Sequence, residues 1–292
     1  MDNHSLPIEE HFQNLLAHQG ITEEITGQLD KIYRPIADWI AQQSQPFVVG
    51  ISGAQGSGKS TLGQILTLLL NQQHQLNVAT LSIDDLYKSH SDRQQMAKEI
   101  HPLFATRGVP GTHDVALGYK TIQSLKTNTQ TQIPRFNKAA DEPLPPSEWP
   151  IFQGAADVVI FEGWCVGATA QHEDALSNPV NIIEKMEDSD GVWRSHINQQ
   201  LKHHYPTLFD LIDAQIMLQI PEYEKVLEWR TLQESKLSHQ NREHHIMSRD
   251  ELKRFVMHFE RLTRFMLSEM PARADIMLPL NHQHQIDKIE FI

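Results

Sequence analysis

The chain has 292 residues, of which 39% are hydrophobic, and a formal net charge of −12 from 25 Lys and Arg against 37 Asp and Glu. This composition allows a full core, and we favour one large α/β domain with insertions over a domain with a helical attachment. The acidic balance argues against a surface for nucleic acid or anionic membranes, because phosphate groups bind basic faces. The single cysteine, Cys165, permits no intrachain disulfide, which suits a reducing cytosol.

The first ten residues are acidic and lack a long apolar core, so they predict neither a secretory signal nor a transit peptide. No run approaches the roughly 18 apolar residues that a membrane span needs. We therefore expect a cytoplasmic protein. Between residues 8 and 44, apolar residues recur at helical spacing and are interrupted at Gly20. This pattern predicts two helices that pack on a sheet, as a helical extension over residues 1–45.

The segment 47–61 combines an apolar run with the pattern Gly53-x-x-x-x-Gly58-Lys59-Ser60, and an apolar-periodic segment follows over 62–70. A strand, a glycine-rich loop and a helix in this order are typical of a Walker A loop. Its glycines let backbone N–H groups surround phosphate oxygens, and the helix that begins near Lys59 directs its positive dipole end at them. We expect Lys59 to reach the β- and γ-phosphates and Ser60 to ligate Mg²⁺. The predicted nucleotide-binding residues are Gly53, Ala54, Gln55, Gly56, Ser57, Gly58, Lys59, Ser60 and Thr61.

A second buried strand is predicted over residues 76–83, and it ends in Asp84-Asp85-Leu86-Tyr87. Ligands of doubly wound sheets bind beyond the carboxyl ends of the strands, so these carboxylates are expected near the reacting groups. One of the two can accept the proton of an attacking hydroxyl. The alternative is a strand-end turn, in which Asp is common, and it has more weight for Asp85 than for Asp84.

Residues 91–100 predict a short helix, and the ordered loop that follows carries Arg107 and His113, which suit an anionic acceptor. Asp114 is alternatively the N-cap of a helix over 115–125. Arg135 and Lys138 belong to a short extended segment, for which a solvated edge strand is an equal alternative. The proline-rich stretch 142–150 predicts a surface connection.

Residues 156–161 predict another buried strand, which ends at Glu162. An acid at this position downstream of a Walker A loop is typical of the Walker B residue, which holds Mg²⁺ directly or through water. Cys165 follows the same strand, where a lone thiol is far more often a packing residue than a nucleophile.

The C-terminal part predicts a polar helix or helix pair over 180–204, a strand over 212–220 and a helix that begins at Pro221 and runs through Leu232. The polar segment 236–247 is interpreted as a mobile lid over the nucleotide phosphates. Arg230 and Arg242 are candidates to bridge the transferring phosphoryl group, and a solvated surface arginine is an equal alternative for Arg242.

Ser248 is predicted to cap the last long helix, which runs to about residue 270 and precedes a final strand over 274–280. Three groups of histidines, at 203–204, 244–245 and 282/284, lack the spacing of a metal site. We interpret them as solvated.

With the Walker A loop, Asp84-Asp85-Leu86-Tyr87 and Glu162 in this order, the chain resembles the P-loop kinases of the phosphoribulokinase, uridine kinase and pantothenate kinase superfamily. Between about Phe47 and Pro279 it also resembles, more narrowly, the D-glycerate 3-kinase family, which includes a fungal ATP-binding kinase branch. The segments that carry this resemblance are Arg107-Gly-x-x-Gly-Thr-His113-Asp114, Pro134-Arg135-Phe-Asn-Lys138, Ser147-x-Trp149-Pro150, Phe161-Glu162-Gly163-Trp164 and Trp229-Arg230-x-x-Gln233-Glu234. The insertion that the family carries after the Arg-Phe-Asn-Lys segment is shortened here.

The resemblance implies a doubly wound, mainly parallel sheet flanked by helices, in a single P-loop kinase domain over 1–292. It implies ATP and Mg²⁺ as cofactors, with Ser60 and Glu162 as the metal ligands. The implied catalytic residues are Lys59, Asp84, Glu162 and Arg230, with Asp84 as the base. The implied acceptor-site residues are Asp84, Tyr87, Arg107, His113, Arg135 and Lys138.

The expected reaction is transfer of the γ-phosphoryl group of ATP to a hydroxyl of a small anionic acceptor, in first place D-glycerate to 3-phosphoglycerate. Ribulose 5-phosphate, pantothenate or a nucleoside are alternative acceptors, and a non-catalytic ATP-binding regulatory protein is an alternative of another class. A GTPase needs an Asn-Lys-x-Asp motif, whereas Asn137-Lys138-Ala139-Ala140 lacks the acid and precedes the Walker B strand. The oligomeric state stays open.

Overall fold

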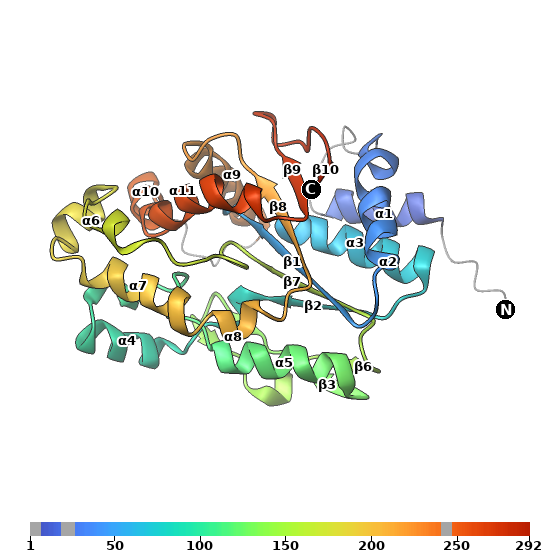
Figure 1. Ribbon diagram of the computed structural model, residues 1–292, viewed down its shortest axis with the longest axis horizontal. Coiled ribbons are helices and arrows are strands. Elements are labelled where there is room, and N and C mark those ends of the chain that lie inside the picture. The colour runs from blue at the N-terminus through green and yellow to red at the C-terminus, as the bar shows by residue number, and fades with distance from the viewer. Residues whose placement is uncertain (1–6, 19–26, 241–246) are drawn as a thin grey trace.

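The computed structural model describes residues 7–18, 27–240 and 247–292. Its centre is a six-stranded sheet with the strand order β10-β9-β8-β1-β7-β2 (Figure 1). The neighbouring strands run parallel, except that β10 is antiparallel to β9. The strands are β1 (Phe47–Gly53), β2 (Val78–Ser82), β7 (Val158–Gly163), β8 (Ala214–Gln219), β9 (Ile276–Pro279) and β10 (Glu290–Phe291).

Successive strand residues contribute to two separate hydrophobic clusters, one on each face of the sheet. In β7, Val158 and Ile160 join the first cluster, whereas Val159 and Phe161 join the second. All seven residues of β1 are buried. Because helices cover both faces of a parallel sheet, its central strands are continuous apolar runs rather than alternating ones. That is the pattern from which the strands at 47–53 and 156–161 are predicted.

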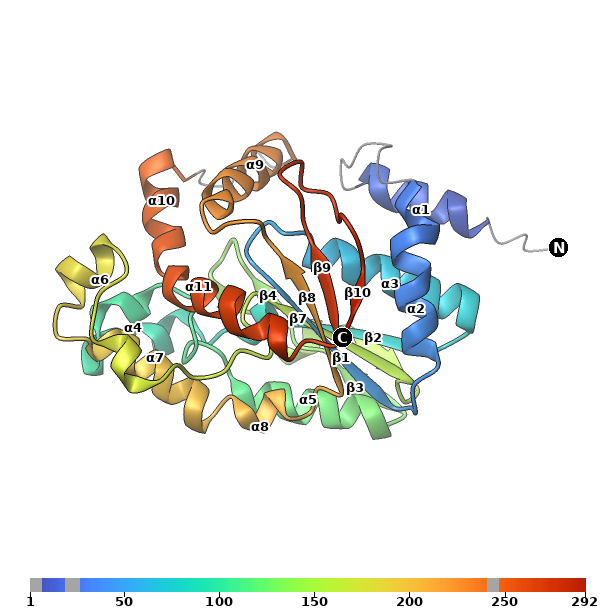
Figure 2. The same cartoon turned by 45° about the horizontal axis from the view of Figure 1, so that its top comes forward.

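The first face is covered by α1 (Ile8–His18), a π-helical turn (Leu29–Tyr33), α2 (Arg34–Ala41) and α3 (Lys59–His74). Figure 2 shows α1, α2 and α3 gathered on the same side of the sheet. Phe12, Ile36 and Ile40 are fully buried in the first cluster. The prediction that the N-terminal helices pack on the sheet holds for α2, whose Trp39 ring contacts Phe47 of β1, whereas α1 packs on α3. The apolar stripe of both helices is core.

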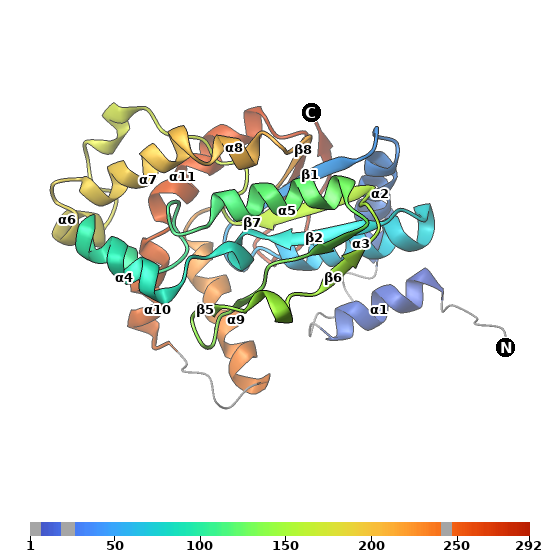
Figure 3. The same ribbon diagram turned by 90° about the horizontal axis from the view of Figure 1, so that it is seen from below.

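The second face is covered by α5 (Val115–Thr127), α7 (Val192–His203), α8 (Pro206–Phe209) and α11 (Glu260–Glu269). In Figure 3, α5 lies in front of β2 and β7, and α3 lies behind them. Trp193 and Leu208 are buried in this second cluster. Helices on both faces of a mainly parallel sheet are the predicted α/β class, which is thereby confirmed.

Smaller elements lie outside this central sheet and its covering helices. Two two-stranded ribbons pair β3 (Gln130–Gln132) with β6 (Ile151–Gln153) and β4 (Phe136–Asn137) with β5 (Glu142–Pro143). The remaining helices are α4 (His90–Glu99), α6 (Ile182–Glu187), α9 (Lys225–Gln240) and α10 (Arg249–Met257), with 3₁₀ turns at Ile83–Leu86, Pro102–Ala105, Pro146–Glu148, Glu173–Leu176 and Met270–Ala272. Within the described residues, no helix is long and apolar enough to span a membrane.

Two predictions for the C-terminal part are wrong, the start of one helix and the last strand. The helix expected from Pro221 begins only at Lys225, because residues 222–224 form a turn in which the backbone N–H of Lys225 bonds Glu222 O. The helical lid expected over 236–247 stays a prediction: residues 236–240 continue that helix, and residues 241–246, which include Arg242, lie outside the described residues. The strand at β9 is not the last, since β10 follows it.

The helix expected from Ser248 to about residue 270 is two helices, α10 and α11. Its cap is confirmed, because the Ser248 side chain accepts a bond from Glu251 N and the Glu251 side chain accepts one from Ser248 N. The break falls at His258 and Phe259. The His258 ring hydrogen-bonds Arg254 O and Phe255 O, and the backbone N–H groups of both residues turn to carbonyls three positions back. This tightening ends the first helix.

Candidate active site

The loop between β1 and α3 has the conformation that a phosphate-binding loop requires. Gly56 and Gly58 have φ angles of +77° and +96°, a left-handed backbone that glycine adopts without strain. Gly58 is the N-cap of α3, so the positive end of the helix dipole meets the loop. The Lys59 ammonium donates to Ala54 O at 3.0 Å. Ser57 Oγ is buried and has no hydrogen-bond partner among the described residues, which fits a ligand that brings acceptor oxygens.

A cavity of about 680 Å³ lies beside this loop, where β1, β2 and β7 end. That volume is within the usual range for sites that bury a ligand of drug or nucleotide size. Gly53, Ala54, His113 and Arg135 do not line it. The other predicted site residues that the structure describes do: Gln55, Gly56, Ser57, Gly58, Lys59, Ser60, Thr61, Asp84, Tyr87, Arg107, Lys138, Glu162 and Arg230.

Ser60 and Glu162 meet at the phosphate end of the cavity, because β1 and β7 are adjacent parallel strands. Ser60 Oγ donates to Glu162 Oε1 at 3.2 Å. Neighbouring ligands of an octahedral Mg²⁺ with bonds of about 2.1 Å lie about 3.0 Å apart, so this oxygen pair fits that metal. Burial lowers the pKa of Lys59, whereas the charges of Glu162 and Asp84 act to raise it.

Asp84 lies on the 3₁₀ turn that follows β2 and has both carboxylate oxygens engaged. Oδ1 accepts a hydrogen bond from Tyr87 OH, and Oδ2 accepts one from Lys138 Nζ, each at 2.6 Å. Burial acts to raise the pKa of Asp84, but the Lys138 charge, with the two hydrogen bonds, outweighs burial and lowers that pKa to about 2. Asp84 is therefore an ionised carboxylate at neutral pH.

Asp85 does not line the cavity, and its carboxylate binds the segment that leads into β4. Its carboxylate accepts bonds from Phe136 N at 3.1 Å and from Arg135 Nη1 at 3.3 Å. Burial raises the pKa of Asp85, and the Arg135 charge opposes it. These contacts favour the alternative that Asp85 is a structural residue at the strand end. The predicted acceptor-site residue Arg135 pairs with Asp85 and does not line the cavity.

His113 is a core residue in this structure, 2% exposed. Its Nδ1 lies 2.5 Å from Tyr205 OH, and its ring stacks on Tyr87 at a centroid distance of 4.9 Å. Burial lowers the pKa of His113 to about 4, so it is neutral at physiological pH. It therefore supports Tyr87 from behind instead of offering a charge to a ligand. Asp114 accepts a bond from Leu117 N, and its predicted role as N-cap is confirmed.

The cavity lining also contains residues outside the predicted site set, and one of them, Trp229, lies against Gly56 of the phosphate loop. The indole of Trp229 and the imidazole of His284 are stacked, with centroids 4.1 Å apart and planes at 16°. Gln28 joins them by donating from Nε2 to Ile286 O at 2.9 Å. His284 is half-buried, so its assignment as a solvated histidine is wrong. The further lining residues of this group are Gln28, Tyr33, Trp229, Leu232, Leu280, Gln283, His284, Gln285 and Ile286.

Arg230 lies on the lining one residue after Trp229, and its guanidinium carbon is 5.8 Å from the centroid of the Phe255 ring. Arg107 lines the acceptor side, where it pairs with Asp141. Asp141 and its second partner, Arg93, belong to no motif that we recognised in the sequence. Only the long-range pairing of α4 with the β4–β5 turn identifies them.

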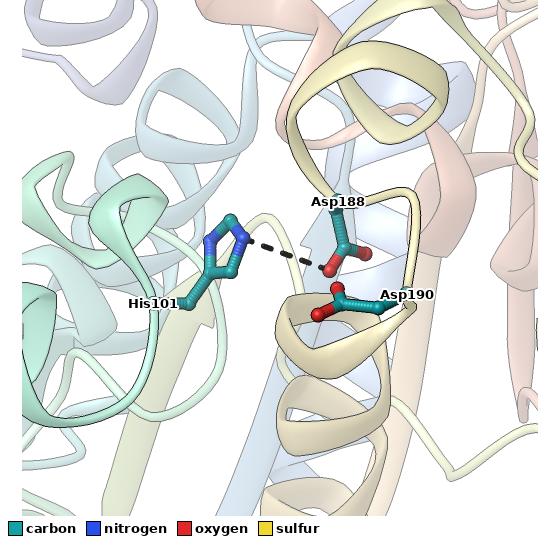
Figure 4. A group of neighbouring side chains, drawn as sticks. All are labelled: His101, Asp188 and Asp190. Atoms are coloured by element: carbon teal, nitrogen blue, oxygen red, sulfur yellow. Dashed lines mark ion pairs between the residues drawn. The ribbon is translucent and has the colours of Figure 1, made fainter.

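His101, Asp188 and Asp190 form another group of metal-binding residue types (Figure 4), and none of them lines this cavity. The two buried members, His101 and Asp188, already have structural partners. The His101 ring faces Glu187 O and Leu103 N, and the Asp188 carboxylate accepts from the N–H groups of Trp193 and Arg194 at the start of α7. Arg194 also pairs with Asp188 at 2.9 Å. The group joins α7 to the turn after α4, and we assign it that role.

Three comparisons relate the chain to known proteins. A sequence model of the "Phosphoribulokinase / Uridine kinase family" matches residues 48–176. The "Uncharacterized kinase mug58" of Schizosaccharomyces pombe is 31% identical over 246 residues, which cover 79% of this chain and 84% of that protein. The chloroplastic D-glycerate 3-kinase of Arabidopsis thaliana is 29% identical over 195 residues, or 63% of this chain but 40% of the relative.

A solved structure of D-glycerate 3-kinase from Cryptococcus neoformans has the same fold. It superposes with a TM-score of 0.75 at 24% identity and covers 89% of this chain and 99% of that one. Together with the phosphate loop and the strand order, these matches settle the family. The chain belongs to the phosphoribulokinase/uridine kinase family of P-loop kinases.

Proposed function

We propose that the chain is a single P-loop kinase domain that transfers the γ-phosphoryl group of ATP to a hydroxyl of a small anionic acceptor, with D-glycerate as the acceptor and 3-phosphoglycerate as the product. One observation carries this proposal. An ionised carboxylate, Asp84, lines the same cavity as the phosphate loop and is flanked there by the cations Lys138 and Arg107. The resemblance to the D-glycerate 3-kinase of Arabidopsis thaliana supports this choice of acceptor.

At the phosphate end, the loop and Lys59 would hold the β- and γ-phosphates, and Ser60 and Glu162 would hold Mg²⁺. The metal, when bound, neutralises charge on those phosphates. Arg230 also lines the cavity, and its guanidinium is suited to stabilise the negative charge on the transferring phosphoryl group. Trp229 is buried behind His284, and the half-buried His284 ring offers a flat surface for the base.

At the acceptor end, Asp84 would act as the general base. The acceptor hydroxyl gives its proton to Asp84 while its oxygen forms a bond to Pγ, and the bond from Pγ to the bridging oxygen of ADP breaks. Lys138 lies on Asp84 Oδ2, and the carboxylate of the acceptor, placed between Arg107 and Lys138, would draw the ammonium away and free Oδ2 for the hydroxyl proton. Tyr87 keeps Asp84 oriented through Oδ1.

The test is ADP production by the purified protein with Mg²⁺-ATP and a panel of acceptors. The panel contains D-glycerate, L-glycerate, glycerol, ribulose 5-phosphate, uridine, pantothenate and no acceptor. We expect strong stimulation by D-glycerate alone, with glycerol as the matched neutral control. Stimulation by another member would replace the acceptor but keep the reaction type. ATP binding without stimulation by any of them would contradict the proposal.

A further inference from the structure

Asp141, in the turn between β4 and β5, is held between two arginines. Its carboxylate pairs with Arg107 through Oδ1 and with Arg93 Nη2 through Oδ2, the latter at 2.6 Å. His90 Nδ1 lies 3.1 Å from Oδ2 on the outer side. Asp141 has a φ of +57°, a conformation that Asp and Asn tolerate better than other side chains. The two arginines fix its carboxylate, whereas His90 is an exposed outer contact.

Arg93 is 1% exposed, and all three nitrogens of its guanidinium donate hydrogen bonds to the residues around Asp141. It donates to Lys88 O at 3.3 Å, to Ala105 O at 2.8 Å and to the carbonyl of Asp141 at 3.3 Å. A buried arginine requires such a set of acceptors, because an unpaired buried charge is costly. Arg93 thereby ties α4 and the turn after it to the β4–β5 turn, and it cannot reach a ligand in the cavity.

Among the arginine and lysine ion pairs of the acceptor side, cations and carboxylates are not equal in number. Lys138 pairs with Asp84, and Arg135 pairs with Asp85, so those two pairs are neutral. Arg93 and Arg107 share the single carboxylate of Asp141, which leaves one positive charge in excess. Of these three residues, only Arg107 lines the cavity. The excess charge is therefore presented to the cavity by Arg107.

Arg107 is presented in a defined orientation. Asp141 holds Nη1, Lys138 O lies 3.4 Å from Nη2, and the guanidinium carbon is 5.6 Å from the centroid of the Phe136 ring. An arginine fixed in this way loses little conformational entropy when a carboxylate docks on it.

We propose that Asp141, held in place by Arg93, is a positioning and specificity-determining residue that orients Arg107 to receive the single carboxylate of the acceptor. This inference rests on the proposed function and adds the residues that select for a monoanionic acceptor over a neutral alcohol. Asp141 and Arg93 act through Arg107 and do not touch the acceptor themselves.

The experiment uses Asp141→Asn, Arg107→Met and the double variant in the full chain. Asparagine keeps the left-handed backbone and a carbonyl acceptor but removes the charge. We expect Asp141→Asn to raise the KM for D-glycerate about tenfold, the scale of one charge-assisted hydrogen bond, with the KM for ATP unchanged. It should also reduce the preference for D-glycerate over glycerol. His90→Gln, which removes the outer contact to the same carboxylate, is the matched control and should change neither constant.

The double variant separates positioning from general stability. If Asp141 acts through Arg107, adding Asp141→Asn to Arg107→Met should have no further effect on the KM for D-glycerate, whereas independent effects would multiply. Multiplying effects, an equal rise in the KM for ATP, or an unchanged KM in Asp141→Asn would each overturn the inference. Absence of D-glycerate turnover in the wild-type protein would instead refute the proposed function, and this inference with it.

Discussion

Lys138 Nζ lies 2.6 Å from Asp84 Oδ2, so the carboxylate proposed as the general base is paired with an ammonium before any acceptor arrives. With Tyr87 on the other oxygen, the pairing lowers the pKa of Asp84 to about 2. A carboxylate of such low basicity is a poor proton acceptor for water. The pair would thus keep ATP from hydrolysis until an anionic acceptor competes for Lys138.

Replacing Asp84 by Asn tests the base itself. We expect turnover to fall at least ~100-fold, the scale of general-base loss, while ATP affinity is retained because the phosphate loop is untouched. Steady-state ADP production and calorimetric titration with ATP measure the two quantities. Asp85→Asn is the matched control. Since Asp85 holds Arg135 and Phe136 N, that variant should lower thermal stability and change turnover much less. Unchanged turnover in Asp84→Asn would remove Asp84 from the mechanism.

Replacing Lys138 by Met tests the pairing. Without the ammonium, burial raises the pKa of Asp84, and the carboxylate becomes a stronger base. If the rate rises with basicity in the usual Brønsted manner, a pKa change of about two units predicts about tenfold faster ATP hydrolysis in the absence of acceptor. The KM for D-glycerate should rise in the same variant, because a cation is lost from the acceptor side. Phosphate release with and without acceptor measures both effects. A rate without acceptor equal to the wild-type rate would show that the pair does not restrain hydrolysis.

The central sheet and the phosphate loop could be predicted from the sequence because their signals are local. A fully buried parallel strand is a continuous apolar run, and the loop after β1 requires glycines at Gly56 and Gly58 for its backbone. The positions of Asp84 and Glu162 follow from the same logic, since β2 and β7 are adjacent parallel strands that end together. Chain order and strand ends suffice to bring these two acids to one cavity.

The rest of the site depends on contacts that no local pattern encodes. Arg93 and Asp141 are 48 residues apart. Trp229 lies on α9, which precedes β9 in the chain, whereas His284 follows β9, and the two rings stack. His113 has the residue type of an anion-binding group, but the fold buries it between Tyr87 and Tyr205. The helix break at His258 depends on a ring that bonds the backbone, which helical propensity does not include.

The buried His113 makes stability depend on pH. Its pKa is lowered from 6.5 to about 4, so between these values the unfolded chain binds a proton that the folded chain does not. The free energy of unfolding should therefore fall as pH drops from about 6.5 to about 4, by up to ~3 kcal/mol at 1.36 kcal/mol per pKa unit.

Urea unfolding at pH 7 and pH 5 tests this dependence. The wild-type protein should lose roughly 2 kcal/mol more than His113→Gln between the two conditions. The exposed His203→Gln serves as the matched control and should lose as much as the wild-type protein. Equal losses in the wild-type protein and His113→Gln would show that His113 is not responsible.

The Trp229–His284 stack should be part of the nucleotide site. Replacing His284 by Asn removes the ring but keeps a residue that tolerates its φ of +66°. Because stacking of a base on an aromatic side chain contributes about 1–3 kcal/mol, we expect ATP to bind at least about fivefold more weakly, with the KM for D-glycerate unchanged. His282→Asn, in the same loop but exposed, should leave ATP affinity at the wild-type value.

Titration with ATP and with inorganic triphosphate separates base binding from phosphate binding, because the loss in His284→Asn should appear only with ATP. An equal loss with triphosphate would mean that His284 supports the phosphate loop instead of the base.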